Sequence, residues 1–427
     1  MSRLKKSRKI FLTGADCFIL ALEKQPFIEG TSGNICRYVI ELEGNLDTNG
    51  LISKIKNNEN IQWLASLSVY KSHMFARPVW KINEKGIVDI NVHESDSFIP
   101  EEVLNKRISV EKPGLFFFDV IHRSKGNSCF IFSWSHLIMD GFGAVLLLKH
   151  LNDSKLGVFL TDDPIEAGAA SFNEAVKAKQ FIEATKKNIL TGLSPSFRHK
   201  QINQKIKVIT FSKEETDEIR ANGPKLGALF GPGPLYLASA ARAVREILAG
   251  RQTIVNNFWV PVPQNQRKKG ATGPLLGNHL SFLFYLLSNA DLTSTDRSVR
   301  SINSQMVNQV KLGIPKSYAS LMQYLRRIPY ALYHHYTRGK KGASLSSFLF
   351  TVAEEHPKEL MTFHGLKVVE ALSFPPNIYP PGLTFAFMAF GGYLHILLQY
   401  YDEVISEVEI TKLEAIMRQE LVLPDCS

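Results

Sequence analysis

Two spacings of hydrophobic residues alternate along the chain and predict a protein of mixed strands and helices. In Ile87–Val92, apolar and polar positions alternate with the period of two that is typical of a strand. The segment Asn45–Asn57 begins with residues suited to cap a helix, and Leu51, Ile52 and Ile55 then recur at helical spacing. Because both kinds of segment follow one another through the chain, the fold class that we expect is α/β.

Further strands are predicted from short runs of apolar residues. In the first part of the chain, they are Cys36–Leu42, Val79–Ile82, Leu115–His122 and Cys129–Ser135. In the second part, they are Ile206–Phe211, Ile254–Val262, Leu280–Leu287, Ser347–Ala353, Leu366–Ser373, Leu383–Phe390 and Tyr393–Tyr400. The pair Gly391–Gly392 predicts a tight hairpin between the last two strands.

The expected helices and the change in composition between them suggest a division of the chain. The helices are Ala144–Leu151, Phe172–Leu190, Lys213–Gly223, Pro234–Leu248, Ser301–Val310, Tyr318–Tyr336 and a last helix from near Ile405. Charged and small residues dominate from about Asn152 to Gln204. We therefore predict an N-terminal lobe over 1–160, a connection over 161–205 and a C-terminal lobe over 206–427, each lobe a mixed sheet flanked by helices.

The composition is that of a protein with a large core and no membrane span. Of the 427 residues, 44% are hydrophobic, yet the longest apolar runs have the length of a strand rather than the ~18 residues of a membrane helix. The basic N-terminus is followed by an apolar segment that Gly14 and Asp16 interrupt, unlike a signal peptide. The four cysteines are scattered without CxxC spacing. We expect a cytoplasmic location, with peripheral membrane contact as an alternative, and no metal.

The net charge of +10 bears on partners rather than on the fold. It suits a phosphate-bearing ligand, an acidic carrier protein or an anionic membrane surface. Nucleic acid is not expected, because the basic residues are spread out and no nucleic-acid-binding motif accompanies them. The run Arg267-Lys268-Lys269 is either a contact for such an anion or a solvated loop. The pair His334-His335 lacks a third ligand at metal-binding spacing, so a surface role is favoured.

The candidate chemistry centres on the heptapeptide Ser135-His-Leu-Ile-Met-Asp-Gly141. A strand delivers the chain to His136, and glycines then allow the backbone to turn into the next helix. An imidazole ionises near neutral pH, so His136 could accept a proton from an attacking hydroxyl or amine. The alternative is that His136 is a hydrogen-bonded loop residue and Asp140 is the cap of the helix.

This heptapeptide resembles the HHxxxDG motif of the chloramphenicol-acetyltransferase-like superfamily, which includes condensation domains. The pattern is most similar to wax ester synthase/diacylglycerol acyltransferases and polyketide-associated acyltransferases. Other segments agree in order along the chain: Leu12–Asp16 with an "LsxxD" segment, Trp259–Val262 and Arg267 with "vPVxxR", Gly277-Asn278 with "GN", Ser347–Val352 with "SNvpG", and Pro375–Tyr400 with the closing strands. The first histidine of the motif is Ser135 here, and the late "SNvpG" segment lacks its Asn and Gly.

The resemblance implies roles for individual residues. His136 matches the catalytic histidine, Asp140 an aspartate that pairs with an arginine from the other lobe, and Arg267 that arginine. Gly141 matches a glycine that keeps the active-site tunnel open. The remaining candidates are residues implied to lie at the substrate or the lobe interface, namely Ser135, Asn278 and Thr351.

The function that the resemblance implies is transfer of an acyl group from a thioester to an alcohol or amine in a tunnel between the lobes. The donor is a thioester of coenzyme A or of a carrier protein, the acceptor is a small molecule or lipid, and no cofactor is implied. Two alternatives stay open: a non-catalytic binding or scaffold protein of the same fold, and a free-standing condensation enzyme that forms amides.

Overall fold

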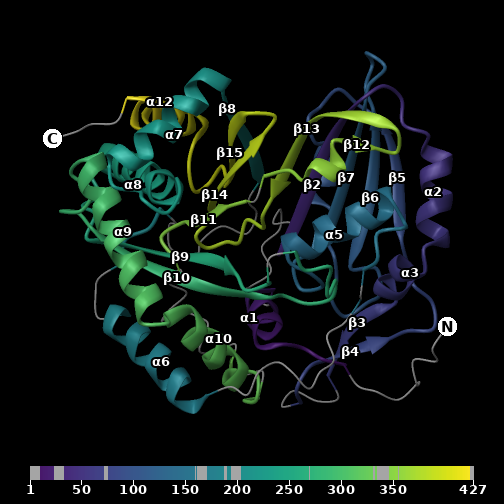
Figure 1. Cartoon of the computed structure of the whole chain (residues 1–427), viewed down its shortest axis with the longest axis horizontal. Helices are drawn as coiled ribbons and strands as arrows, with labels where there is room; N and C mark the ends of the chain where they lie inside the picture. Colours follow the sequence, from purple (N-terminus) through teal and green to yellow (C-terminus); the bar gives the residue numbers. More distant parts are fainter. Residues whose placement is uncertain are drawn as a thin grey trace.

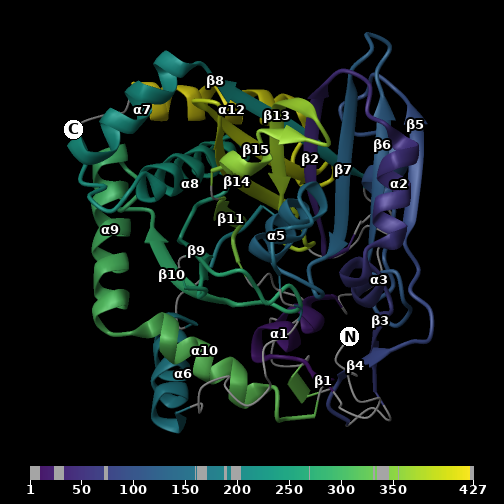
Figure 2. The same ribbon diagram turned by 45° about the vertical axis from the view of Figure 1, so that its right-hand side comes forward.

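The chain folds into two lobes that stand side by side (Figures 1 and 2). The computed structural model describes residues 10–23, 33–71, 76–158, 160, 171–186, 190–193, 203–268, 270–329, 332–333, 346–353 and 355–423. Within this part of the chain, no helix is long and apolar enough to span a membrane. His334, His335, Lys269 and Cys426 lie outside the described residues, whereas Cys17, Cys36 and Cys129 are buried and free.

The N-terminal lobe is built on a six-stranded sheet in the order β12-β13-β2-β7-β6-β5. Its strands are β2 (Ile35–Glu43), β5 (Asp89–Glu94), β6 (Phe116–His122), β7 (Ser128–Ser135), β12 (Thr362–Phe363) and β13 (Leu366–Phe374). All neighbours are antiparallel except β5 and β6, which are parallel. A small sheet accompanies it, with β1 (Ile10–Phe11), β3 (Leu67–Tyr70) and β4 (Val79–Ile82).

The helices of the N-terminal lobe are α1 (Gly14–Glu23), α2 (Thr48–Asn57), α3 (Glu59–Ala65), α4 (Glu101–Asn105) and α5 (Gly141–Asn152). Side-chain caps fix where several of them begin. Asp47 accepts a hydrogen bond from the N–H of Gly50 at the start of α2, and Asn58 accepts one from Ile61 at the start of α3. Helix α5 is apolar on most sides and lies between the lobes (Figure 1).

The C-terminal lobe contains a four-stranded sheet, β11-β14-β15-β8, and a separate hairpin of β9 and β10. The strands are β8 (Gln204–Phe211), β9 (Asn257–Asn265), β10 (Leu280–Ser288), β11 (Leu349–Val352), β14 (Leu383–Phe390) and β15 (Tyr393–Tyr401). The helices are α6 (Phe172–Lys186), α7 (Lys213–Lys225), α8 (Gly233–Gly250), α9 (Thr295–Lys311), α10 (Ile314–Leu325) and α12 (Glu407–Val422). The 3₁₀ helix η2 (Lys358–Leu360) lies between β11 and β12 and contacts α5 of the N-terminal lobe.

The two lobes share a buried apolar contact where their main sheets meet. Val39 and Ile131 from the N-terminal sheet belong to one buried cluster with Met388 and Leu397 from the C-terminal sheet. Removing this area from water stabilises the pairing of the lobes by roughly 25 cal/mol per Å². The lobes are therefore held together by a core as well as by the chain that connects them.

Most predicted strands and helices are present close to the expected boundaries, which confirms the α/β class with two lobes. The hairpin at Gly391–Gly392 joins β14 and β15, and both glycines have positive φ. Helix α9 begins at Thr295, earlier than predicted, because Ser294 caps it. Helix α10 ends at Leu325, so a continuous helix over Tyr318–Tyr336 is wrong.

The division of the chain into 1–160, 161–205 and 206–427 stays a prediction. The pairing of the strands shows, in addition, that the N-terminal sheet contains strands from the C-terminal part of the chain. Strands β12 and β13 come from the C-terminal part of the chain and complete the N-terminal sheet, where β13 pairs with β2. Figure 1 shows these two strands beside β2, and β13 also contacts β14 of the other lobe. The chain therefore crosses between the lobes after β11 and returns at β14.

The close crossing of α1 and α10 yields a stability prediction. A Cβ atom added at Gly14 would lie 2.5 Å from the carbonyl carbon of Met322, a backbone atom that cannot rotate away. Gly14→Ala should therefore destabilise the fold by about 1–3 kcal/mol, measured by urea unfolding. Gly141→Ala is the matched control, because a Cβ there meets no atom within 4 Å. Equal stability of the two variants would contradict this packing.

Candidate active site

Strand β7 ends at Ser135, which places His136 at the end of the N-terminal sheet that faces the other lobe. The last residue of β7, Ser135, pairs with Ile35 of β2, and the N–H of His136 then donates to the carbonyl of Asn34 at 2.8 Å. The indole N–H of Trp134 donates to the carbonyl of Met139 at 3.0 Å. The loop is thus tied back to its own strand, which limits how far the imidazole can move.

Asp140 ends the loop and begins α5. Its Oδ1 accepts a hydrogen bond of 2.8 Å from the N–H of Gly143, the geometry of a helix cap. Its carboxylate also accepts bonds of 3.0–3.3 Å from Arg267 and one of 3.0 Å from the N–H of His279. Asp140 is fully engaged as an acceptor, which suits it to hold the loop rather than to exchange protons.

Arg267 reaches Asp140 from the loop of the β9–β10 hairpin, which extends from the C-terminal lobe towards α5 and α1 (Figure 1). Its side chain is 2% exposed, and a further N–H donates to the carbonyl of Pro274 at 2.7 Å. Its guanidinium also lies over the ring of Phe142, with 5.3 Å between the guanidinium carbon and the ring centroid. This ion pair therefore joins the two lobes beside His136.

A second connection between the lobes holds the backbone of the histidine loop. The side-chain amide of Asn278 donates to the carbonyl of His136 at 2.9 Å and to that of Leu137 at 3.3 Å. The same amide group and the N–H of Asn278 both donate to Oδ1 of Asp16, at 3.0 and 2.8 Å. The neighbouring N–H of Gly277 donates to the carbonyl of Ile138 at 2.7 Å. The loop is thereby held on two sides.

The sequence does not predict the role of Asp16, although Leu12–Asp16 resembles a segment of the family pattern. Its Oδ2 accepts from the N–H of Thr13 at 2.8 Å, and the Thr13 hydroxyl accepts from the N–H of Asp16 at 3.0 Å. This reciprocal pair, at the spacing of a capping box, starts α1 and leaves Oδ1 free to bind Asn278. The spacing Thr-x-x-Asp was the available signal, but it predicts only a helix start.

The imidazole of His136 is held mainly in its neutral form. Burial lowers the pKa of His136 below its ordinary value, and its own backbone, the charge of Asp140, the side chain of Asn278 and the charge of Asp16 oppose that shift. Nδ1 is buried and makes no hydrogen bond within the described residues, whereas Nε2 retains access to the cavity that the ring lines. A neutral imidazole with an accessible nitrogen can accept a proton.

His136 lines a cavity of about 700 Å³ between the lobes. This volume is within the roughly 300–1,000 Å³ range of small-molecule sites. Residues of both lobes form its walls, and most are apolar, including Phe18, Trp134, Phe142, Leu146, Phe282 and Phe350. Seven prolines add rigid wall segments, namely Pro261, Pro263, Pro357, Pro375, Pro376, Pro380 and Pro381. The site is suited to a largely apolar reactant.

The structure brings His136, Asp140, Gly141 and Thr351 to this cavity. A Cβ on Gly141 would meet open space, which agrees with its implied role of leaving room beside the histidine. Ser135 and Asn278, predicted to bind substrate, are instead 1% and 3% exposed and bind the loop. The Ser135 hydroxyl accepts from the N–H of Leu137 at 3.3 Å, so both residues act through the position of His136.

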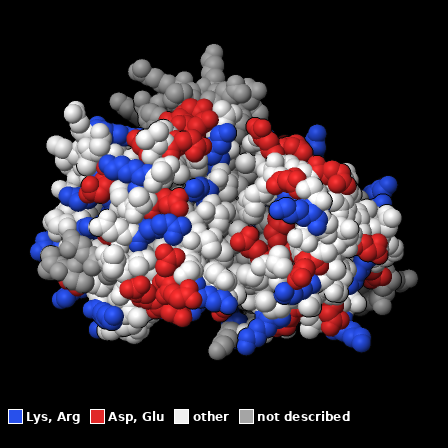
Figure 3. Space-filling view, turned by 90° about the horizontal axis from the view of Figure 1, so that it is seen from above, with Lys and Arg blue, Asp and Glu red and all other residues white. Residues whose placement is uncertain are grey.

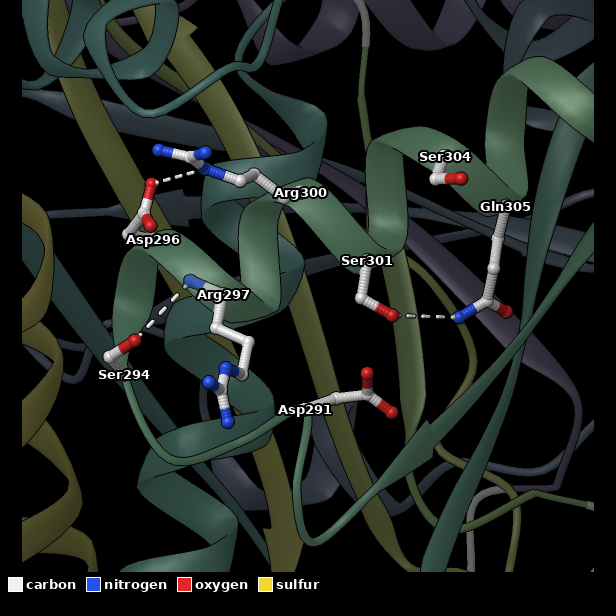
Figure 4. A pocket seen from close by; sticks show the side chains of 8 residues that line it. All are labelled: Asp291, Ser294, Asp296, Arg297, Arg300, Ser301, Ser304 and Gln305. Atoms are coloured by element: carbon white, nitrogen blue, oxygen red, sulfur yellow. Dashed lines mark hydrogen bonds and ion pairs between the residues drawn. The ribbon is translucent and has the colours of Figure 1, made fainter. Parts of the chain in front are cut away.

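A second hollow, of about 580 Å³, lies at the start of α9 on the outside of the C-terminal lobe (Figure 4). Two of its charged residues pair with each other, since Arg300 donates to Asp296 at 2.8 Å. The residues that line it include no histidine or cysteine. Within the described residues, no group of three or more His, Cys, Asp or Glu could hold a metal ion. The cavity at His136 is therefore the candidate active site.

The comparison with solved structures reveals the same architecture over nearly the whole chain. The first condensation domain of the CDA synthetase superposes with a TM-score of 0.72 at 14% identity, over 99% of this chain and 98% of that one. The chain has the fold of a condensation domain. No protein-family model matches the sequence, and a search of the curated proteins gives no significant match.

Acyltransferases share this condensation-domain fold. A trichothecene 15-O-acetyltransferase from Fusarium sporotrichioides superposes with a TM-score of 0.69 at 12% identity, over 97% of this chain and 94% of that one. The starter condensation domain of rhizomide synthetase, a variant in complex with C8-CoA, gives 0.65 at 13% identity, over 97% and 95%. The similarity to wax ester synthases in particular rests on sequence motifs alone.

Asp140 both caps α5 and pairs with Arg267, and two substitutions distinguish these roles. Asp140→Ala leaves the buried guanidinium of Arg267 without the carboxylate that neutralises it and should destabilise the fold by about 3–5 kcal/mol. Asp140→Asn keeps an acceptor for the N–H of Gly143 but loses the charge, so it should retain the ~0.5–2 kcal/mol of the cap and be the milder variant. Urea unfolding measures both. An Asp140→Ala protein as stable as wild type, but inactive, would contradict this positioning role and point to direct chemistry.

Proposed function

We propose that this chain is an acyltransferase in which His136 is the general base. The observation that supports this most strongly is the placement of a neutral imidazole, held by groups from both lobes, on the wall of an apolar cavity between them. A general base contributes to catalysis only when it is positioned and unprotonated. The solved structures with this fold include an acetyltransferase and a domain in complex with C8-CoA, and we carry their chemical class to this chain as part of the proposal.

In the proposed reaction, Nε2 of His136 removes the proton of an acceptor hydroxyl or amine while that atom attacks the carbonyl of an acyl thioester. A tetrahedral oxyanion forms and collapses, the carbon–sulfur bond breaks, and the imidazolium returns the proton to the leaving thiolate. The products are the acylated acceptor and a free thiol. The donor carrier is proposed to be coenzyme A or a carrier protein, and no covalent intermediate with the enzyme is needed.

An amide-forming condensation enzyme is the second candidate, because the first condensation domain of the calcium-dependent antibiotic synthetase, solved with substrate analogues, shares the fold. The two candidates differ in the acceptor. Thiol release from a panel of short and long acyl thioesters should therefore be followed with matched alcohol and amine acceptors. Turnover with amines alone favours condensation, whereas binding of apolar ligands without any thiol release favours a scaffold protein.

The base assignment predicts the pH dependence. Only neutral His136 can accept a proton, so activity should fall as the pH drops through the pKa of the imidazole. Because burial lowers that pKa, the midpoint should lie below the ordinary value of about 6.5. His136→Ala should lower turnover by roughly 10²–10⁴-fold and remove this acidic limb.

His279→Ala is the matched control, because His279 also lines the cavity and should leave the acidic limb in place. Circular dichroism confirms that each variant folds. A His136→Ala protein that releases thiol as fast as wild type would overturn the base assignment.

A negative charge on the acyl donor can be tested through the effect of salt on the apparent KM for the donor. Lys268 is exposed on the hairpin loop, whose residues Gly270–Thr272 line the cavity, so it could meet a phosphate or an acidic carrier. Figure 3 shows Lys and Arg interspersed with Asp and Glu on the face in view, so attraction there would come from particular residues rather than from a broad basic patch. Added salt should raise the apparent KM for the donor.

Lys268→Glu should weaken that salt dependence, and Lys56→Glu on the exposed side of α2 should not. Initial rates at several ionic strengths measure both variants. An unchanged salt dependence in Lys268→Glu would assign Lys268 to solvated surface.

A further inference from the structure

The cavity wall formed by β2 and β13 contains two neighbouring residues with hydroxyl groups, Tyr38 and Ser373. Tyr38 lines the cavity and is 3% exposed, and its strand neighbour in β7 is Phe132. The strand pair places Tyr38 three residues beyond Ile35, which lies opposite Ser135 beside His136. At 3.3 Å per residue, Tyr38 lies about 10 Å from Ile35 along the strand. Tyr38 therefore faces a part of the reactant that is remote from the reacting carbonyl.

His356 determines which way the hydrogen of this hydroxyl points. The ring atom Nδ1 of His356 lies 2.7 Å from the Tyr38 oxygen, and Nε2 lies 2.9 Å from the carbonyl oxygen of Leu360. A carbonyl oxygen can only accept, so Nε2 must carry the proton of the neutral ring, and Nδ1 must accept from Tyr38. The hydrogen of the phenol is thus directed to His356, and its oxygen keeps its capacity to accept.

The electrostatic surroundings support this arrangement. Burial lowers the pKa of His356 below its ordinary value, the contact with Leu360 opposes this, and the charge of Lys149 adds to the lowering. Burial raises the pKa of Tyr38, so the phenol remains protonated. Within the described residues, no hydrogen bond to the Tyr38 hydroxyl other than that of His356 is present. The neutral His356 accepts the hydrogen of the phenol. The oxygen of Tyr38 is therefore left to accept a hydrogen bond from another group.

We propose that Tyr38 determines specificity by accepting a hydrogen bond from a hydroxyl or amide N–H on the reactant that occupies this part of the cavity. The proposal rests on the acyl transfer proposed above, since it names a chemical feature of the reactant of that same site. Other hydrogen-bonding groups line the cavity nearby, namely the hydroxyl of Ser373, which is opposite Tyr38 in β13, and the carboxylate of Glu359, which pairs with Lys149. Among these, the phenol is the group whose hydrogen is directed away by His356. A purely aliphatic reactant leaves the Tyr38 oxygen unused, whereas a reactant with a hydrogen-bond donor at this depth gains a bond.

The experiment uses acyl thioesters of one chain length that carry a hydroxyl at successive positions, with the plain chain as reference. A second series places the hydroxyl on the acceptor, so the two arms identify which reactant contacts Tyr38. Wild type should prefer one isomer with a remote hydroxyl by roughly 2- to 10-fold in kcat/KM, the range of one neutral hydrogen bond. In Tyr38→Phe, the ratio of hydroxylated to plain reactant should fall to about 1.

Tyr400→Phe is the matched control, because its hydroxyl donates to Glu407 at 2.9 Å, outside the cavity, and its loss should leave the preference of wild type intact. A second variant, His356→Leu, removes the acceptor of the phenol hydrogen. The hydroxyl of Tyr38 can then turn its hydrogen to the cavity, so a keto isomer, which can only accept, should now be preferred over the plain chain, as it is not in wild type. A merely structural role of His356 would not add a preference for the keto isomer.

Binding of unreactive amide analogues of the same isomers, measured by calorimetry, keeps this test separate from turnover. If no thioester releases thiol, the proposed acyl transfer fails, and the binding preference still decides the role of Tyr38. A wild type that shows no preference at any position on either reactant overturns the proposal. So does a Tyr38→Phe protein that keeps the preference.

Discussion

The structure depends on one constraint: a loop that begins in one lobe must be held by the other. Arg267 and Asn278 come from the hairpin of the C-terminal lobe, and they bind Asp140 and the carbonyl of His136 in the N-terminal lobe. A buried arginine without its partner carries a large desolvation cost, so the hairpin and the loop are stable only together. The position of the imidazole is therefore a property of the assembled pair of lobes rather than of either lobe alone.

This coupling explains why so many polar groups lie beside an apolar cavity. Asp140 serves as a helix cap and as the partner of Arg267, and Asp16 both starts α1 and accepts from Asn278. Each carboxylate satisfies backbone groups that would otherwise be buried without partners. Because these groups satisfy one another, the cavity itself can stay apolar, and the same burial lowers the pKa of His136.

The sequence predicts the elements well and the connections between them less well. Strands such as β7 and β14 are long apolar runs with clear turn residues at their ends, so local pattern suffices. The pairing of β13 with β2 joins residues more than 300 positions apart, and no local spacing encodes that contact. The pairing of Asp140 with Arg267 was implied by family resemblance, whereas the role of Asp16 depends on a tertiary contact with Asn278. Periodicity alone could not have placed Ser135 and Asn278 behind the loop rather than on the cavity wall.

The residue that we propose as the base and the one that we propose to select the reactant are held in different ways in this fold. His136 needs a fixed position, so its supports form a dense network of short hydrogen bonds around one loop. The part of the cavity wall that contains Tyr38 needs only the correct depth and polarity. It combines β2 with the segment near η2 that contains His356, which lies 318 positions after Tyr38 in the sequence. A change at His356 can therefore alter which hydrogen-bonding group the cavity accepts while the bonds that hold the histidine loop stay intact. The rise of about 10 Å along β2 between the two regions would keep the proposed specificity contact apart from the proposed base.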